Sequence, residues 1–276
     1  MDGYHIPVLL QPVGTYMEVK PDNYYIDATL GGGGHTAPIL AGGGWVLGLD
    51  QDPEALSACP DSDHLIKVRS NFIHLLEVAG KNHWPPVSGI LFDLGVSWHQ
   101  LTTASRGFSF QVDGPLDMRM DPTIPVTAGD LVNGLPARDL AKIIADFGGE
   151  RQAGRIAGQI TRHRPLSTTL ELAAILPAPS RRRVFQALRI AVNDELGALE
   201  TALPQALELL RPGGRLLVIS FHSLEDRLVK QTFKKWKFQN LGTNLTSGPV
   251  IPDMLEIGQN PKSQSAKLRV FQKKYV

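Results

Sequence analysis

Four consecutive glycines, residues 31–34, follow a short apolar segment that ends at Asp27, and a segment with helical character begins directly after them at Thr36. Glycine tolerates positive φ angles and allows the backbone to approach a ligand closely. In an open α/β sheet the loop after the first strand is the usual nucleotide cradle. We therefore expect an α/β fold whose first loop binds a nucleotide-like cofactor.

The segments around this loop alternate between strand and helix character. Short apolar runs at 24–27, 45–50, 65–68 and 89–93 each end in polar residues, which predicts a parallel, doubly wound sheet. From Arg106 the pattern becomes helical, with helices expected at 137–147, 153–163, 170–176 and 185–199. A helix at 203–210, a strand at 215–220, a loop at 239–264 and a last strand at 266–271 complete the expected elements. We expect a discontinuous domain of residues 1–105 and 200–276, split by a helical insertion of residues 106–199.

The glycine loop is compatible with two nucleotide-containing cofactors, NAD and S-adenosyl-L-methionine. The dinucleotide fingerprint G-x-G-x-x-G lacks its last glycine, because Thr36 stands in that place. Asp50, at the end of the second strand, suits a ribose diol in either cofactor. A carboxylate at Asp27 attracts the ammonium group of a methionine moiety and repels a pyrophosphate. These residues favour S-adenosyl-L-methionine over NAD and over the oxidoreductase function that NAD implies.

Positive charge gathers in two blocks of the chain. Residues 151–189 contain eight arginines and one carboxylate, and residues 227–274 contain ten lysines and arginines against two carboxylates. Solvated helix faces are one explanation. Phe233, Trp236 and Phe238, interleaved with the second block, favour an RNA partner instead.

Composition narrows the class of protein further. With 276 residues, of which 42% are hydrophobic, the chain can bury a substantial core. Its single cysteine, Cys59, excludes an intramolecular disulfide and a cysteine-rich zinc site, and no pair of carboxylates has a spacing specific enough to predict a metal site. The N-terminus has neither a signal peptide nor a membrane span, so we expect a cytoplasmic protein. The oligomeric state stays open, with a homodimer as one alternative.

A series of motifs runs in order along nearly the whole chain, at residues 5–10, 32–35, 93–97, 106–110, 113–121, 185–193, 220–227 and 265–269. On these motifs the sequence resembles the ribosomal RNA small subunit methyltransferase H family. The resemblance implies a Rossmann-like methyltransferase sheet split by a helical substrate-recognition insertion. It also implies S-adenosyl-L-methionine-dependent methylation of the N4 amine of a cytosine in 16S ribosomal RNA near the decoding centre.

The resemblance also implies a set of cofactor residues. The family positions match Gly33, Gly34, His35, Asp50, Phe72, Asp93 and Gln100, to which the loop argument adds Asp27 and Gly31. The chain departs from the family pattern at Trp98 and His99, where the family usually has Ser-Pro.

Catalytic and RNA-binding residues can be predicted in the same way. Asp93, at the end of the fourth strand, is expected to position the target amine together with the cofactor. His222 and Asn193 are further candidates, His222 as a proton acceptor or as a plain hydrogen-bonding residue. The expected RNA contacts are Arg119, Arg151, Arg155, Arg181, Arg182, Arg183 and Arg189, and the expected partner is the 30S subunit or its RNA. Two alternatives stay open: an RNA-binding assembly protein without turnover, and an amino-methyltransferase of another nucleic acid.

Overall fold

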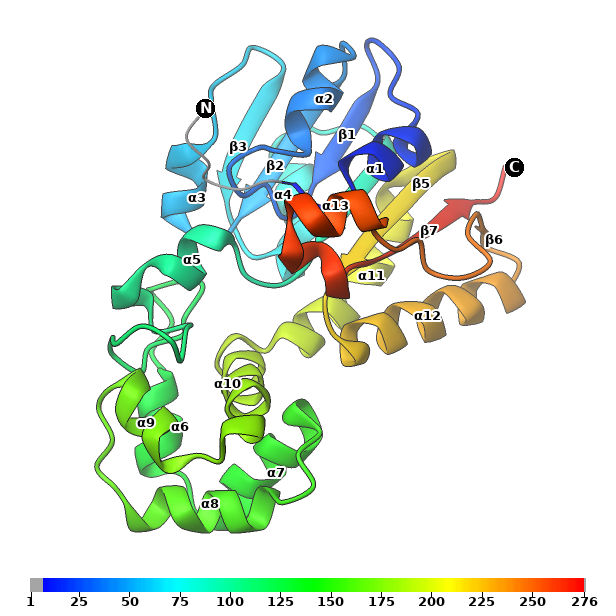
Figure 1. The fold of residues 1–276 in the computed structure, drawn as a ribbon. Helices are drawn as coiled ribbons and strands as arrows, with labels where there is room; N and C mark the ends of the chain where they lie inside the picture. The colour runs from blue at the N-terminus through cyan, green and yellow to red at the C-terminus, as the bar shows by residue number, and fades with distance from the viewer. Residues whose placement is uncertain (1–6, 276) are drawn as a thin grey trace. The chain divides into compact units, whose positions relative to one another are not determined.

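A seven-stranded sheet forms the centre of the larger of two compact units (Figure 1). The computed structural model describes residues 7–275, so residues 5 and 6 of the first motif lie outside the described part. The strand order is β3-β2-β1-β4-β5-β7-β6, in which β1 to β5 pair in parallel and β7 pairs antiparallel with β5 and β6. The strands are β1 (Tyr24–Asp27), β2 (Trp45–Asp50), β3 (Leu65–Arg69), β4 (Val87–Asp93), β5 (Leu210–Ser220), β6 (Gly242–Asn244) and β7 (Lys267–Lys273).

The chain winds in opposite directions from the centre of this sheet. From β1 it proceeds outward to β2 and β3, whereas β4 lies on the other side of β1 and leads to β5. The loops after β1 and β4 therefore diverge at a topological switch point, which is where open α/β sheets bind ligands. The α/β, Rossmann-like fold class predicted from the sequence is confirmed.

Helices cover both faces of the sheet because side chains alternate along each strand. Ile26 and Leu47 belong to the hydrophobic cluster that includes residues of α4 (Leu75–Lys81), α11 (Glu195–Leu209) and α12 (Ser223–Phe238). Their neighbours Tyr25 and Val46 belong to the opposite cluster, with α1 (Leu10–Met17) and α2 (Thr36–Ala41). The short α3 (Pro53–Ala58) follows β2 and begins at Asp52, whose side chain accepts the Glu54 N–H.

The second unit, Val96–Glu195, is helical and has its own core. Its α-helices are α5 (Trp98–Thr102), α6 (Ala128–Gly134), α7 (Ala137–Gly148), α8 (Ala153–Arg162), α9 (Thr169–Ile175) and α10 (Ala178–Asn193). Leu140 and Ile144 of α7 pack with Ile156 of α8 and Leu188 of α10. The contacts divide the chain at 95/96 and 195/196, ten and four residues before the expected boundaries.

Several sequence-based expectations about secondary structure were wrong. The single helix expected at 185–199 is interrupted, because Asp194 adopts a left-handed conformation (φ 46°) between α10 and α11. The expected loop at 239–264 contains β6 and α13 (Met254–Gln259), which begins at the capping residue Asp253. Short elements with capping residues and little apolar periodicity give a weak signal in the sequence. No helix within residues 7–275 combines the length and apolar character needed to cross a lipid bilayer.

Replacing Leu140 with Ala is expected to destabilise the helical unit. Leu140 is completely buried in α7, so the change removes packed methyl groups and leaves a cavity that costs about 2–5 kcal/mol of unfolding free energy. Chemical denaturation followed by circular dichroism measures the loss. Arg138→Ala, at an exposed position of the same helix, is the control and should change the unfolding free energy by less than about 0.5 kcal/mol. Equal effects of the two variants would contradict the assignment of Leu140 to the core.

Candidate active site at the carboxyl edge of the sheet

Asp27 lies under the glycine loop at the end of β1, with only 1% of its surface exposed. Its Oδ1 accepts the Thr29 N–H (3.2 Å), and its Oδ2 accepts the Thr36 hydroxyl at the start of α2 (2.7 Å). Burial raises the pKa of the Asp27 carboxyl, although the Thr36 hydrogen bond and the nearby His35 oppose that rise. The structure thus gives Asp27 a supporting place beneath the loop, whereas the sequence argument expected a direct contact with a ligand ammonium group.

The glycine loop has a backbone that only glycine adopts readily. Gly31 and Gly33 have φ angles of 52° and 81°. A Cβ at Gly33 would lie 2.7 Å from the Cys59 sulfur, and one at Gly34 would lie 3.2 Å from Pro7. The loop therefore packs closely against its neighbours, and a side chain at either position would displace it.

Asp50 ends β2 beside this loop. One carboxylate oxygen accepts the Gly31 N–H (2.8 Å), and the other accepts the Asp52 N–H (2.9 Å). Burial raises the pKa of the Asp50 carboxyl to about 6, against the lowering effect of these two hydrogen bonds. Each carboxylate oxygen can accept a second hydrogen bond, so Asp50 is able to bind a pair of hydroxyl groups.

Asp93 ends β4 and faces His35 of the glycine loop. The His35 Nε2 lies 3.5 Å from the Asp93 Oδ2, and the two side chains are 5% and 13% exposed. Burial lowers the pKa of the His35 imidazole, but the carboxylates of Asp93 and Asp27 outweigh this effect and raise it. The Asp93 N–H also donates to the Thr29 hydroxyl (2.6 Å). The ends of β1 and β4 are therefore held together at the switch point.

The two remaining predicted cofactor residues lie in different units. Phe72 begins η1 (Phe72–His74) and is half-buried, with its ring edge-on to Phe92 at 5.4 Å between centroids. Gln100 belongs to α5 of the helical unit, where its side chain accepts the Ser97 N–H in a capping box. The residues that depart from the family pattern, Trp98 and His99, form the first turn of this same helix.

His222 and Asn193 both have structural hydrogen bonds. The His222 Nδ1 accepts the Glu225 N–H (3.4 Å) and caps α12. The Asn193 side chain accepts the Met120 N–H (2.7 Å) and donates to the Met118 carbonyl (2.8 Å), so it holds the loop before α6 in place. This geometry favours the plain hydrogen-bonding interpretation of His222 and a positioning role for Asn193 within the helical unit.

The predicted RNA-binding arginines differ in how freely they present their charge. Arg119 forms a two-point ion pair with Asp117, and Arg189 forms one with Glu195. Arg183 is exposed but pairs with Glu150 (3.0 Å), and Arg181 is partly buried. The remaining three are exposed on or beside α8 and α10: Arg151, Arg155 and Arg182.

The aromatic residues of the second basic block have a different role from the one expected. Phe233 and Trp236 are 2% and 6% exposed and stack within the core between α12 and the sheet, so the prediction that they interleave with the basic residues on an RNA-binding surface was wrong. Phe238 is 93% exposed. Residues 233 and 236 share the face of α12 that packs against the sheet, whereas 238 lies on the opposite face.

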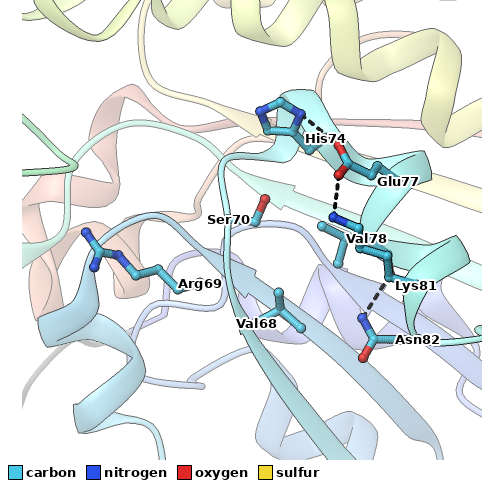
Figure 2. A pocket seen from close by; sticks show the side chains of 8 residues that line it. All are labelled: Val68, Arg69, Ser70, His74, Glu77, Val78, Lys81 and Asn82. Atoms are coloured by element: carbon cyan, nitrogen blue, oxygen red, sulfur yellow. Dashed lines mark hydrogen bonds and ion pairs between the residues drawn. The ribbon is translucent and has the colours of Figure 1, made fainter. Parts of the chain in front are cut away.

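A pocket of about 260 Å³ lies beside the end of β3, outside the predicted cofactor residues (Figure 2). Its lining combines cationic, anionic and apolar side chains: Val68, Arg69, Ser70, His74, Glu77, Val78, Lys81 and Asn82. Glu77 pairs with both His74 (3.4 Å) and Lys81 (2.6 Å), as Figure 2 shows, so much of the positive charge here is neutralised. We therefore assign no ligand to this pocket.

Three residues near the site were missed by sequence reasoning. Thr29 and Thr36 connect Asp27 to β4 and α2, and their place on either side of the glycines is a signal that could have identified them. Glu256 of α13 accepts the Leu9 N–H (2.6 Å) and contributes to the field at His35. No local pattern reveals Glu256, because it approaches the loop from more than 200 residues further along the chain.

Replacing Gly33 with Ala is expected to destabilise the protein by about 1–3 kcal/mol, because the positive φ and the contact with the Cys59 sulfur both oppose a Cβ. Thermal unfolding measures the change. Gly80→Ala is the control: it lies in α4 with open space around it and should be neutral or stabilising by up to about 1 kcal/mol. A Gly33→Ala protein as stable as the control would refute the loop geometry.

Comparisons with known proteins identify relatives that match nearly the whole chain. Two relatives named ribosomal RNA small subunit methyltransferase H are each 46% identical to the chain. The protein from Symbiobacterium thermophilum aligns over 99% of this chain and 98% of its own, and that from Heliobacterium modesticaldum over 98% of each. A solved structure described as an rRNA methylase from Streptococcus thermophilus covers 96% of this chain and 95% of its own at 13% identity, with a TM-score of 0.46. The model of the MraW methylase family matches residues 2–274, and the chain belongs to that family.

Proposed function

We propose that this protein transfers a methyl group from S-adenosyl-L-methionine to the N4 amine of a cytosine in small-subunit ribosomal RNA. The observation that carries the proposal is the set of carboxylates at the ends of β1, β2 and β4 around the glycine loop, in a chain of the MraW methylase family. The relatives' name supports the ribosomal RNA substrate. The reaction takes place in the cytoplasm, where small subunits are available.

The residues around the loop fit S-adenosyl-L-methionine. Asp50 has spare acceptor positions for the ribose hydroxyls, and the half-buried ring of Phe72 offers a flat apolar surface for an adenine. The buried Nδ1 of His35 has no hydrogen-bonding partner within residues 7–275, and a polar ligand group in the loop would supply one. Gln100, which belongs to the helical unit, is the further position that matches the family's cofactor residues.

Asp93 is the residue that we assign to the target amine. The cofactor supplies an already activated sulfonium methyl group, so the chain mainly has to position its nucleophile. A cytosine amine is a weak nucleophile because its lone pair is delocalised into the ring. Hydrogen bonds from its N–H groups to the Asp93 carboxylate and the neighbouring backbone carbonyl would localise that lone pair. Asp93 suits this role because Thr29 and His35 hold it in place.

Replacing Asp93 with Ala is expected to lower kcat by at least about 100-fold, because the amine loses its acceptor. The measurement uses methyl-labelled S-adenosyl-L-methionine and small subunits from a strain that lacks the activity, followed by nucleoside analysis of the RNA. Asp63→Ala, at an exposed position, is the control and should retain full activity. Absence of N4-methylcytidine with the unmodified protein, despite cofactor binding, would refute the substrate and favour a binding protein without turnover.

The affinity for S-adenosylhomocysteine is expected to depend on pH through Asp50. Its carboxyl has a pKa of about 6, and the ionised form accepts the ribose hydroxyls, so the affinity should be constant above that pH and fall up to about tenfold per unit below it. Isothermal titration calorimetry between pH 5 and 8 measures this. In Asp50→Asn the dependence on this group should vanish. Asp27 is present in both the unmodified protein and Asp50→Asn, so any pH dependence that it causes is the same in the two. Identical pH profiles of the two proteins would therefore contradict the role of Asp50.

A further inference from the structure

The exposed face of α12 carries positive charge without any carboxylate. Val229, Phe233 and Trp236 define the buried face of this helix. At 100° per residue the exposed side chains lie within an arc of roughly 160° on the other side. They are Ser223, Arg227, Lys230, Gln231, Lys234, Lys235, Lys237 and Phe238.

The two acidic residues of α12 are held on the inner side of the helix. Glu225 is 2% exposed and accepts the Phe221 N–H (2.8 Å). Asp226 pairs with Arg269 (2.7 Å) and Lys267 (3.5 Å) of β7, which lower the pKa of its carboxyl against the effect of partial burial. Neither acid therefore neutralises the outer face. Within residues 7–275, none of the five outer cations has an ion-pair partner, so their charge is available to an external ligand.

The spacing on this face suits a polyanion with repeated charges. Arg227, Lys230 and Lys234 follow one another at roughly 4.5 and 6 Å along the helix axis. Phe238 continues the same stripe one turn later and is 93% exposed, although a ring of this size is normally buried. Single-stranded nucleic acid is bound by rows of cations that follow its phosphate backbone and by exposed aromatic rings that stack on its bases.

We propose that the outer face of α12 is a docking surface for the substrate's ribosomal RNA. The lysines and Arg227 bind consecutive backbone phosphates, and Phe238 stacks on an unpaired base. This inference rests on the proposed function and deepens it, because it assigns RNA contacts to the sheet unit in addition to the arginines of the helical unit. These cations are not among the residues assigned to the cofactor or to the target amine. They therefore raise the affinity for the RNA substrate and leave the methyl-transfer step unchanged.

The test compares two variants that each lose two positive charges from exposed positions of the sheet unit. Lys230→Gln/Lys234→Gln removes phosphate contacts from the stripe. Lys20→Gln/Arg211→Gln removes the same charge elsewhere. For the α12 variant we expect the Kd for small subunits, measured by filter binding, and the KM to rise roughly three- to tenfold for each lost contact. The slope of log Kd against log salt should fall by about two. The kcat and the S-adenosylhomocysteine affinity should stay unchanged, and the control variant should behave like the unmodified protein.

Phe238 provides an independent variant. Phe238→Ala should weaken subunit binding about 5- to 100-fold without changing the salt slope, and Phe238→Trp should restore it. Unchanged binding and salt slope in the α12 double variant, or the same effect in its control, would overturn the inference. Subunit binding that depends on α12 without methylation would refute the proposed function and leave the docking surface standing. Methylation of the subunit with an unaltered KM in the α12 double variant would overturn the docking surface and leave the proposed function standing.

Discussion

The buried carboxylate of Asp27 is the interaction on which the ligand-binding edge of the sheet depends. An unpartnered carboxylate at this depth would be very costly, and the Thr29 amide and the Thr36 hydroxyl offset that cost. Thr29 in turn accepts the Asp93 amide. Two neighbouring strands and the helix after the glycine loop are thereby joined at one point. The loop can hold its positive-φ glycine conformations in one arrangement because both of its ends are fixed in this way.

This arrangement concentrates negative charge in a partly dry environment. Asp27, Asp50 and Asp93 end three adjacent strands, and burial raises the pKa of the first two. Asp93 and Asp27 also raise the pKa of the His35 imidazole and so favour its protonated form. A field of this sign attracts a cationic ligand, and S-adenosyl-L-methionine carries both a sulfonium and an ammonium group. The site therefore binds the charged cofactor more tightly than the product, which is neutral at sulfur, and this difference favours the exchange of product for fresh cofactor.

Helix packing also decides which cations of each unit are exposed. On α12 the carboxylate of Asp226 pairs with β7, and that of Glu225 accepts a backbone N–H at the helix N-terminus. The cations of this helix are exposed. In the helical unit Arg119 and Arg189 are neutralised by carboxylates, whereas Arg151, Arg155 and Arg182 are exposed. Each unit thus carries exposed cations of its own, and the sheet unit also has the acidic strand ends, as a protein that binds both a cationic cofactor and a polyanionic substrate requires.

By itself the sequence determined the fold class, the glycine loop and the carboxylates at the strand ends, because strand alternation, glycine clusters and polar strand ends are local signals. The family followed from ordered motifs along the whole chain. Tertiary structure decided which charges and rings are exposed: it buried Phe233 and Trp236, placed Asp27 beneath the loop and brought Glu256 close to His35. Exposure and pairing depend on segments far apart in the chain, and no local pattern encodes which of those segments meet.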